Sequence, residues 1–204
     1  KLIMMIADDG IGFDENNKPI FNEEVKKDLD RLYGAVRDTN EIHAEELGAR
    51  PSIKLTTIKP SGSISLLMGV SAGMHWHWSS YMIRRVRFSA NSSLIPVLQE
   101  CGYYIEPAVA GFREDGSYNI DPHTYVVEFP IKAPTAEHPM FQAENDVPLY
   151  EQSAVQALLQ SYWSDNAVSA TLTFNKEEGR EEETIKEIAA VLEQSKRILK
   201  STSL

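Results

Sequence analysis

Apolar residues recur with helical spacing in several stretches of the chain. In residues 22–48, Val25 and Leu29 lie four positions apart, and further apolar residues continue the same face. Apolar positions at such intervals form one side of a helix. Asn22 is a suitable N-cap for this helix, and Gly48 is a suitable end. The same spacing predicts helices over residues 93–101, 149–162 and 184–199.

Other stretches alternate apolar and polar residues and are rich in β-branched side chains. Alternation is typical of strands, because successive side chains point to opposite faces of a sheet. It predicts strands over residues 53–58, 81–88, 124–131 and 166–174. The order of strands and helices favours an α/β fold. No repeat or low-complexity linker interrupts residues 1–204, so we expect one piece with no internal domain boundary.

Composition limits the classes of function. Of 204 residues, 42% are hydrophobic and 25% charged, ordinary values for a globular protein. The formal net charge is -10, from 20 Lys and Arg against 30 Asp and Glu. A surface of that sign repels phosphate backbones, so we expect no binding to a nucleic acid polymer.

The chain has a single cysteine, Cys101, which excludes an internal disulfide and any all-cysteine metal site. This composition favours a reducing compartment, and we expect the cytoplasm. The apolar opening, residues 1–6, is followed at once by Asp8 and Asp9. It therefore has neither the layout of a signal peptide nor the length of a membrane span, and we expect no membrane association. Because no initiator methionine is present, we expect the chain to begin inside a longer protein.

A loop rich in hydroxyl groups follows the first predicted strand. Residues 56–60 lead into Ser61-Gly62-Ser63-Ile64-Ser65, where a glycine permits close approach and free backbone N–H groups favour an anion. The loop is not a P-loop, because Lys59 precedes the glycine and the second glycine of that motif is missing. Two interpretations are open, a phosphate-binding loop and an ordinary hydroxyl-rich turn.

Histidines and tryptophans alternate in the next block, His75-Trp76-His77-Trp78. On an extended chain the two histidines share one face and could bind a metal, although no third ligand at suitable spacing is evident. Alternatively the tryptophans pack and the histidines form hydrogen bonds, or the aromatic wall seats a large planar cofactor. Composition alone does not separate these readings.

Two further features carry candidate chemistry. Arg84, Arg85 and Arg87 lie within four positions, with Arg85 and Arg87 on one face of the predicted strand, and could bind a triphosphate or neighbouring carboxylates. Cys101 has no nearby base, which favours a buried structural thiol over a nucleophile.

Five blocks of the sequence resemble the monomeric adenosylcobalamin-dependent ribonucleotide reductases, and they occur in the order of that family. They span about residues 53–204, and the first 50 residues are compatible though less distinctive. The blocks are Lys54–Ser63, Gly73–His77 with Tyr81 and Arg85–Phe88, Glu128–Ala133, Tyr162–Ser169 and Lys200–Leu204.

The resemblance implies a C-terminal segment of the ten-stranded α/β barrel of ribonucleotide reductases. The family reduces the ribose 2′-carbon of ribonucleoside triphosphates, using adenosylcobalamin to generate a thiyl radical, and thioredoxin recharges a C-terminal cysteine pair. It implies that the substrate phosphates lie along Pro60, Ser61, Gly62, Ser63, Ile64 and Ser65. It also makes Met74, His75, Trp76, His77, Trp78 and Tyr81 candidates for contact with the cobalamin.

The departures from the family are as informative. The radical cysteine, the electron-donating pair and the terminal pair have no counterparts, since only Cys101 is present. The Asp-x-His-x-x-Gly cobalamin signature is also absent, because no glycine follows Asp121-Pro122-His123 at the required place, so we expect no histidine of this segment on the cobalt. We therefore expect the isolated chain to be inactive and to need the remainder of the barrel. Alternative interpretations are an inactive scaffold or binding module derived from the barrel, and the barrel part of a glycyl-radical anaerobic reductase.

Overall fold

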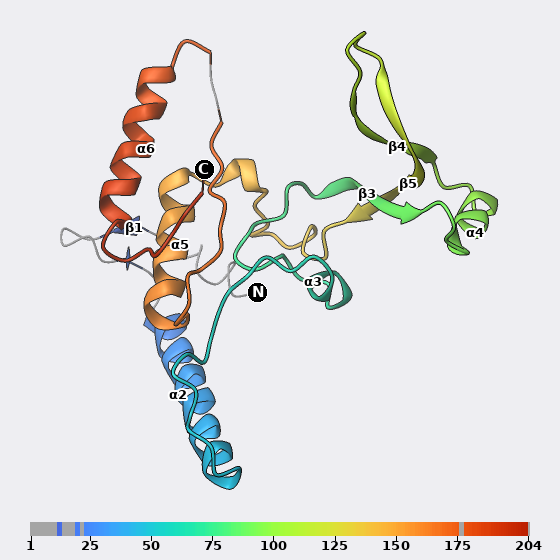
Figure 1. The fold of residues 1–204 in the computed structure, drawn as a ribbon. Coiled ribbons are helices and arrows are strands. Elements are labelled where there is room, and N and C mark those ends of the chain that lie inside the picture. Colours follow the sequence, from blue (N-terminus) through green and yellow to red (C-terminus); the bar gives the residue numbers. More distant parts are fainter. Residues whose placement is uncertain (1–11, 14–18, 21–22, 176–177, 204) are drawn as a thin grey trace. The chain divides into compact units, whose positions relative to one another are not determined.

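The computed structural model describes residues 12–13, 19–20, 23–175 and 178–203. Its described residues form two compact units, one from the residues up to Trp78 together with those from Glu137 onward, and one from Ser79–Ala136. We refer to them as the helical unit and the sheet unit (Figure 1). That the chain is one piece with no internal domain boundary stays a prediction.

The helical unit is built around α5 (Leu149–Tyr162), which is buried along most of its length. Helix α6 (Glu181–Ser195) and the start of α2 (Glu23–Glu46) pack against it (Figure 1). The short strands β1 (Gly12–Phe13) and β2 (Pro19–Ile20) pair antiparallel and also contact α5. The remaining elements are α3 (Ile64–Leu67) and the 3-10 helix η1 (Glu144–Asp146). The core includes Val25, Leu29, Met74, Val155, Leu158, Val168, Leu172 and Val191.

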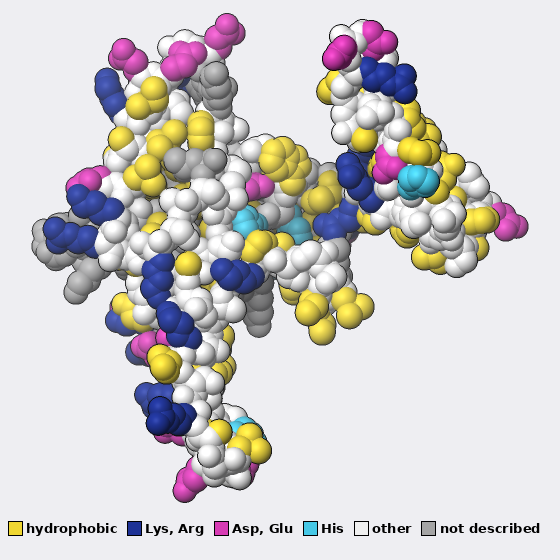
Figure 2. Space-filling model, viewed as in Figure 1, with side chains coloured by type: hydrophobic (Ala, Val, Ile, Leu, Met, Phe, Trp, Pro, Cys, Tyr) yellow, Lys and Arg dark blue, Asp and Glu magenta, His cyan; other side chains and the backbone are white. Residues whose placement is uncertain are grey.

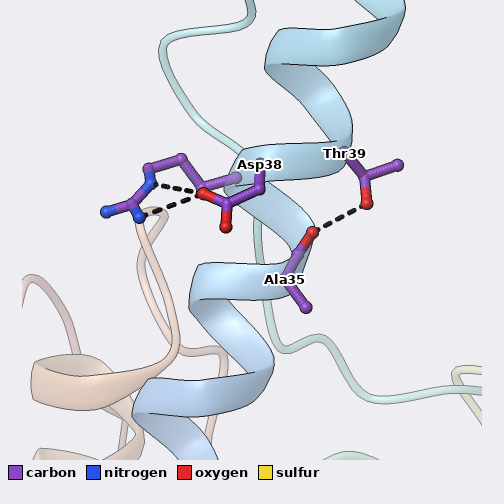
Figure 3. Close-up of polar contacts among 4 residues, drawn as sticks. Ala35, Asp38 and Thr39 are labelled. Atoms are coloured by element: carbon purple, nitrogen blue, oxygen red, sulfur yellow. Dashed lines mark hydrogen bonds and ion pairs between the residues drawn. The ribbon is translucent and has the colours of Figure 1, made fainter.

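Helix α2 follows its predicted pattern. Its first turns bury Val25 and Leu29, as the apolar spacing requires, and Gly48 follows its end with a φ of 63°. Farther along, polar side chains bond locally: the Thr39 hydroxyl donates to the Ala35 carbonyl at 2.8 Å, and Asp38 accepts from its neighbour Arg37 (Figure 3). The predicted N-cap, Asn22, lies outside the described residues. The predicted helices over 149–162 and 184–199 are confirmed as α5 and α6, although α6 begins and ends earlier.

Three buried glutamines on one face of α5 form hydrogen bonds with backbone groups that would otherwise need partners in a sheet. Gln152, Gln156 and Gln160 lie four positions apart, which places them on one side of the helix. Each carboxamide nitrogen donates to two backbone carbonyls, at 2.8 to 3.2 Å. The carbonyls belong to Val147, Ser164, Asn166, Val168, Thr173 and Ser201.

The predictions of strands over 53–58 and 166–174 are wrong, since neither segment is a strand in the structure. Side chains such as Gln152 and Gln160 take many of the backbone bonds that a ladder would use. Only scattered backbone bonds join the two segments, including Ser169 N–H to the Ile58 carbonyl at 3.0 Å, and Thr171 forms an isolated parallel bridge with Ser203.

The sheet unit contains three antiparallel strands in the order β3-β5-β4. They are β3 (Tyr81–Ser89), β4 (Ile105–Phe112) and β5 (Tyr118–Lys132), with α4 (Leu94–Glu100) between β3 and β4. The predicted strands 81–88 and 124–131 and the predicted helix 93–101 are confirmed. Strand β4 was not predicted, because Pro107, Gly111 and two register shifts break its alternation.

The described part of the chain is thus a mixed helix and sheet structure, and it contains no helix long and apolar enough to cross a membrane. Several apolar side chains lie on its surface. Figure 2 shows a group of them over α3, where Ile64, Leu67 and Met68 are exposed.

Candidate functional site

The hydroxyl-rich loop of residues 60–65 is held by a reciprocal pair of serine bonds. The Ser61 hydroxyl oxygen accepts from the backbone N–H of Ser65 at 2.9 Å, and the Ser65 hydroxyl donates to the Ser61 carbonyl at 2.7 Å. Ser65 is buried, whereas Gly62 and Ser63 are exposed. Among the described residues, no acceptor takes the backbone N–H groups of Gly62, Ser63 and Ile64. The loop thus presents free donors to solvent.

Gly62 has no structural need to be glycine. Its φ is not in the left-handed region, and an added Cβ would meet no atom within 4 Å. Gly73 is the opposite case: its φ is 61°, and an added Cβ would lie 2.9 Å from the Lys59 carbonyl oxygen. Backbone contact at Gly73 therefore joins the loop that follows Lys59 to the block that contains the histidines and tryptophans.

His75 is fixed by two backbone partners. One ring nitrogen, Nδ1, lies 2.9 Å from the Ala72 carbonyl, and the other, Nε2, lies 3.1 Å from the Thr171 backbone nitrogen. A carbonyl only accepts and a backbone N–H only donates, so the ring is the neutral tautomer with its proton on Nδ1. Both nitrogens are therefore occupied, which leaves His75 without a lone pair for a metal.

The other members of this block differ in their exposure. Met74 is buried in the core of the helical unit, and Trp76 packs against that core. The His77 ring stacks on Phe141 with centroids 6.4 Å apart, and its carbonyl accepts from the Glu144 N–H at 2.9 Å. These contacts fit the packing and hydrogen-bonding interpretation for His75, Trp76 and His77.

Two exposed aromatic side chains remain. Trp78 is 59% exposed and lines a shallow hollow of about 370 Å³ whose other walls include Thr171, Thr173 and Phe174. Tyr81 is 67% exposed and belongs to the sheet unit, where the Lys132 ammonium lies 5.8 Å from the centre of its ring.

The arginines and the cysteine lie in the sheet unit. Arg85 and Arg87 share a face of β3, as predicted. Arg85 forms an ion pair with Glu106, and its Nε lies 3.3 Å from a Glu128 carboxylate oxygen. Of the two predicted kinds of partner, this arginine therefore binds neighbouring carboxylates. The prediction of a buried Cys101 is wrong: the thiol is exposed at the end of α4. Within the described residues, no group of three or more His, Cys, Asp or Glu side chains could hold a metal ion.

Sequence reasoning missed Asp165, which connects three segments of the helical unit. Its carboxylate accepts from the Leu55 N–H at 2.8 Å, the Thr56 N–H at 3.4 Å and the Tyr33 hydroxyl at 2.9 Å. The Leu55 N–H is the main reason that the pKa of Asp165 lies below its ordinary value, although burial acts against this. The hydrogen bond to Asp165 raises the pKa of Tyr33. The only sequence signal was the place of Asp165 in the Tyr162–Ser169 block.

Comparison with known proteins adds to this geometry. The chain matches no protein-family model. It is 46% identical over 187 residues to the adenosylcobalamin-dependent ribonucleoside-triphosphate reductase of Lacticaseibacillus paracasei, covering 92% of this chain and 23% of that protein. The protein of the same name from Lactobacillus gasseri is 44% identical over 190 residues. This match covers 93% of this chain and 23% of that protein.

Among solved structures, a crystal structure of a B-12 dependent (class II) ribonucleotide reductase matches with a TM-score of 0.77 and 38% identity. The match covers 98% of this chain and 26% of that one. The chain therefore spans about a quarter of the length of the proteins that it resembles.

Proposed function

We propose, from the correspondence of this chain to a segment of adenosylcobalamin-dependent ribonucleoside-triphosphate reductases, that it is part of an enzyme that reduces ribonucleoside triphosphates to 2′-deoxyribonucleoside triphosphates. The segment belongs to the C-terminal half of a ten-stranded α/β barrel, and the remainder of that barrel is its partner. It contributes the loop that holds the substrate phosphates and part of the surface that contacts the cobalamin.

The observation that carries the phosphate proposal is the glycine at position 62. Nothing in the fold requires a glycine there, because an added Cβ would meet open space. Yet Gly62 lies beside free N–H groups, where the absence of a side chain lets a ligand approach the backbone closely. Backbone N–H groups that point at one place form an anion site, and a charge-assisted bond from each to a phosphate oxygen is strong.

The hydroxyl groups of the loop have separate tasks. Ser61 and Ser65 hold the turn by bonding to each other, so they fix the direction of the N–H groups. Ser63 is exposed and offers its hydroxyl to a phosphate oxygen. Lys59, which precedes the loop, donates to the Ala167 carbonyl at 3.3 Å and brings a positive charge to the same region.

The cofactor proposal rests on which of the candidate side chains are exposed to solvent. Bound adenosylcobalamin supplies the radical that starts the reduction. Of the candidates, Trp78 and Tyr81 present open aromatic faces, whereas Met74 is buried. The hollow beside Trp78 is much smaller than a cobalamin, so it would form one wall of a larger site. With both ring nitrogens in use, His75 offers the cobalt no ligand, and the similarity to adenosylcobalamin-dependent proteins favours this cofactor over a glycyl radical.

The radical and redox steps belong to parts of the enzyme outside this chain. The proposed chemistry needs a thiyl radical, an electron-donating cysteine pair and a further pair recharged by thioredoxin, whereas the chain has only Cys101. Cys101 is exposed at the end of α4, and a single thiol cannot form either of the two required pairs. The isolated chain therefore binds substrate groups without reducing them.

The substitution Gly62→Ala tests the phosphate loop. We expect it to leave the free energy of unfolding nearly unchanged, since the methyl group has room. It should weaken the binding of a ribonucleoside triphosphate by about tenfold or more, the effect of losing one charge-assisted hydrogen bond. Calorimetric titration of the native protein with the triphosphate, and with inorganic tripolyphosphate, measures this directly.

Gly34→Ala is the matched control, because Gly34 lies in α2 and an added Cβ there also meets no atom within 4 Å. This variant should bind tripolyphosphate as the unchanged protein does. Equal affinity in the Gly62→Ala and Gly34→Ala variants would remove the loop from the phosphate site. If the folded, unchanged protein binds neither the triphosphate nor adenosylcobalamin, the scaffold alternative is correct.

A further inference from the structure

We propose that His75 is a positioning residue for the phosphate loop: its neutral ring ties residues 72–75 to Thr171 and thereby holds the 60–65 loop in its binding conformation. The inference rests on the proposed function of that loop, and gives His75 a role other than contact with cofactor or metal. Three contacts in the helical unit form the connection.

The first contact fixes the ring. The Thr171 N–H donates to Nε2 at 3.1 Å, and Nδ1–H donates to the Ala72 carbonyl at 2.9 Å. Thr171 lies in a segment that the α5 glutamines hold on both sides, through Val168 and Thr173. Met74 of the same turn is already buried in the core. The His75 ring adds a polar attachment from this turn to the Thr171 backbone, across a sequence separation of 96 residues.

The second contact is the close approach of the turn to the loop. The turn that contains Ala72 and His75 also contains Gly73, whose backbone lies against the carbonyl of Lys59. No other residue type fits, because an added Cβ would come within 2.9 Å of that oxygen and the φ of 61° suits glycine. A displacement of this turn would therefore remove its backbone contact with Lys59 and Pro60.

The third set of contacts joins Ile58 and Lys59 to the 166–171 segment. Its ammonium donates to the Ala167 carbonyl, and the Ser169 N–H donates to the carbonyl of Ile58. The residues that lead into the loop are thus held between the 166–171 segment and the Gly73 turn, and His75 joins these two supports. Loss of the ring would free one side of the entrance to the loop, while the core contacts of α5 persist.

The test uses the native protein and inorganic tripolyphosphate, which reports on the phosphate site alone. We expect His75→Ala to weaken tripolyphosphate binding by about tenfold, because small displacements of positioned groups carry large penalties. His75→Gln should restore most of the affinity, since its carbonyl oxygen can accept from Thr171 and its amide can donate to Ala72. Gly73→Ala should weaken binding in the same direction as His75→Ala.

Two controls separate positioning from general stability. His43→Ala removes an exposed histidine of α2 that pairs with Glu46, and should leave the affinity unchanged. Val191→Ala removes part of a buried apolar side chain of α6 and destabilises the core, but valine makes no side-chain hydrogen bond to the turn or to the 166–171 segment. It should also leave the affinity unchanged at temperatures where the protein is folded. If Val191→Ala weakens binding as much as His75→Ala does, His75 is only a stabilising residue and the inference fails.

Failure of this inference is distinguishable from failure of the proposed function. Ser63→Asp places a negative charge in the loop independently of His75, with Ser63→Asn as its uncharged match. If Ser63→Asp and Gly62→Ala both leave tripolyphosphate binding intact, the loop is not the phosphate site and both proposals fall. If they weaken it but His75→Ala does not, the phosphate loop stands and the positioning role is wrong.

Discussion

At the scale of single residues, the carboxylate of Asp165 connects three segments of the helical unit. It accepts two backbone N–H groups and the Tyr33 hydroxyl, and its pKa in the folded protein lies below the ordinary value chiefly because of the Leu55 N–H. A carboxyl with a lowered folded-state pKa stabilises the fold above its unfolded pKa of about 3.9. That contribution is lost as the pH falls through the folded-state pKa.

The substitution Asp165→Asn should therefore lower the free energy of unfolding at pH 7 by about 1.5 to 3 kcal/mol, the range for hydrogen bonds to a charged group. The difference between the two proteins should shrink as the pH falls below about 4. Urea unfolding at a series of pH values measures it. Asp38→Asn is the control, since Asp38 is exposed and, among the described residues, pairs with Arg37 alone. A constant difference for Asp165→Asn across the whole pH range would contradict the prediction.

At the scale of elements, the glutamines of α5 explain why 166–174 is no strand. Gln156 is fully buried and donates to the carbonyls of Val168 and Ser201. The substitution Gln156→Leu keeps the volume but leaves both carbonyls without that donor. We expect the free energy of unfolding to fall by about 1 to 3 kcal/mol, measured by urea unfolding at pH 7. Gln99→Leu, at an exposed site in α4, should change it by less than about 0.5 kcal/mol.

The same elements show what the sequence could and could not predict. Helices α2, α4 and α6 and strand β3 follow from local spacing, because their own residues decide which face is buried. Helix α5 also follows from its apolar spacing, but its glutamine face is buried as well. The segment 166–174 alternates like a strand, but its partners are side chains of a helix, and glutamines at helical spacing normally indicate a solvent face.

The candidate site shows the same division. The Ser61–Ser65 turn is local, so the sequence indicated a possible anion loop. The role of His75 depends on Thr171, and that of Asp165 on Leu55, at separations of 96 and 110 residues. A single sequence contains no signal for such distant pairs. The assignment of cobalamin contacts to residues 74–78 and Tyr81 remains a prediction.

At the scale of the whole molecule, the two units differ in how much they bury. The helical unit has a continuous core around α5 that includes Val155. The sheet unit buries few side chains, Val127 among them, and exposes large apolar ones such as Phe112 and Tyr118. A three-stranded sheet with so small a core has little hydrophobic stabilisation of its own. The structure therefore makes the sheet unit the less stable of the two.

We accordingly expect urea to unfold the chain in two steps, with the sheet unit first, and hydrogen exchange followed by mass spectrometry assigns each step to its residues. Val127→Ala should lower the free energy of the first unfolding step, and Val155→Ala that of the second. Each decrease should be about 2 kcal/mol, the contribution of a buried valine. A single unfolding transition, whose free energy both substitutions lower equally, would mean that the units fold together. In that case the expectation of one piece with no internal boundary would be correct, because cooperativity rather than shape defines a folding unit.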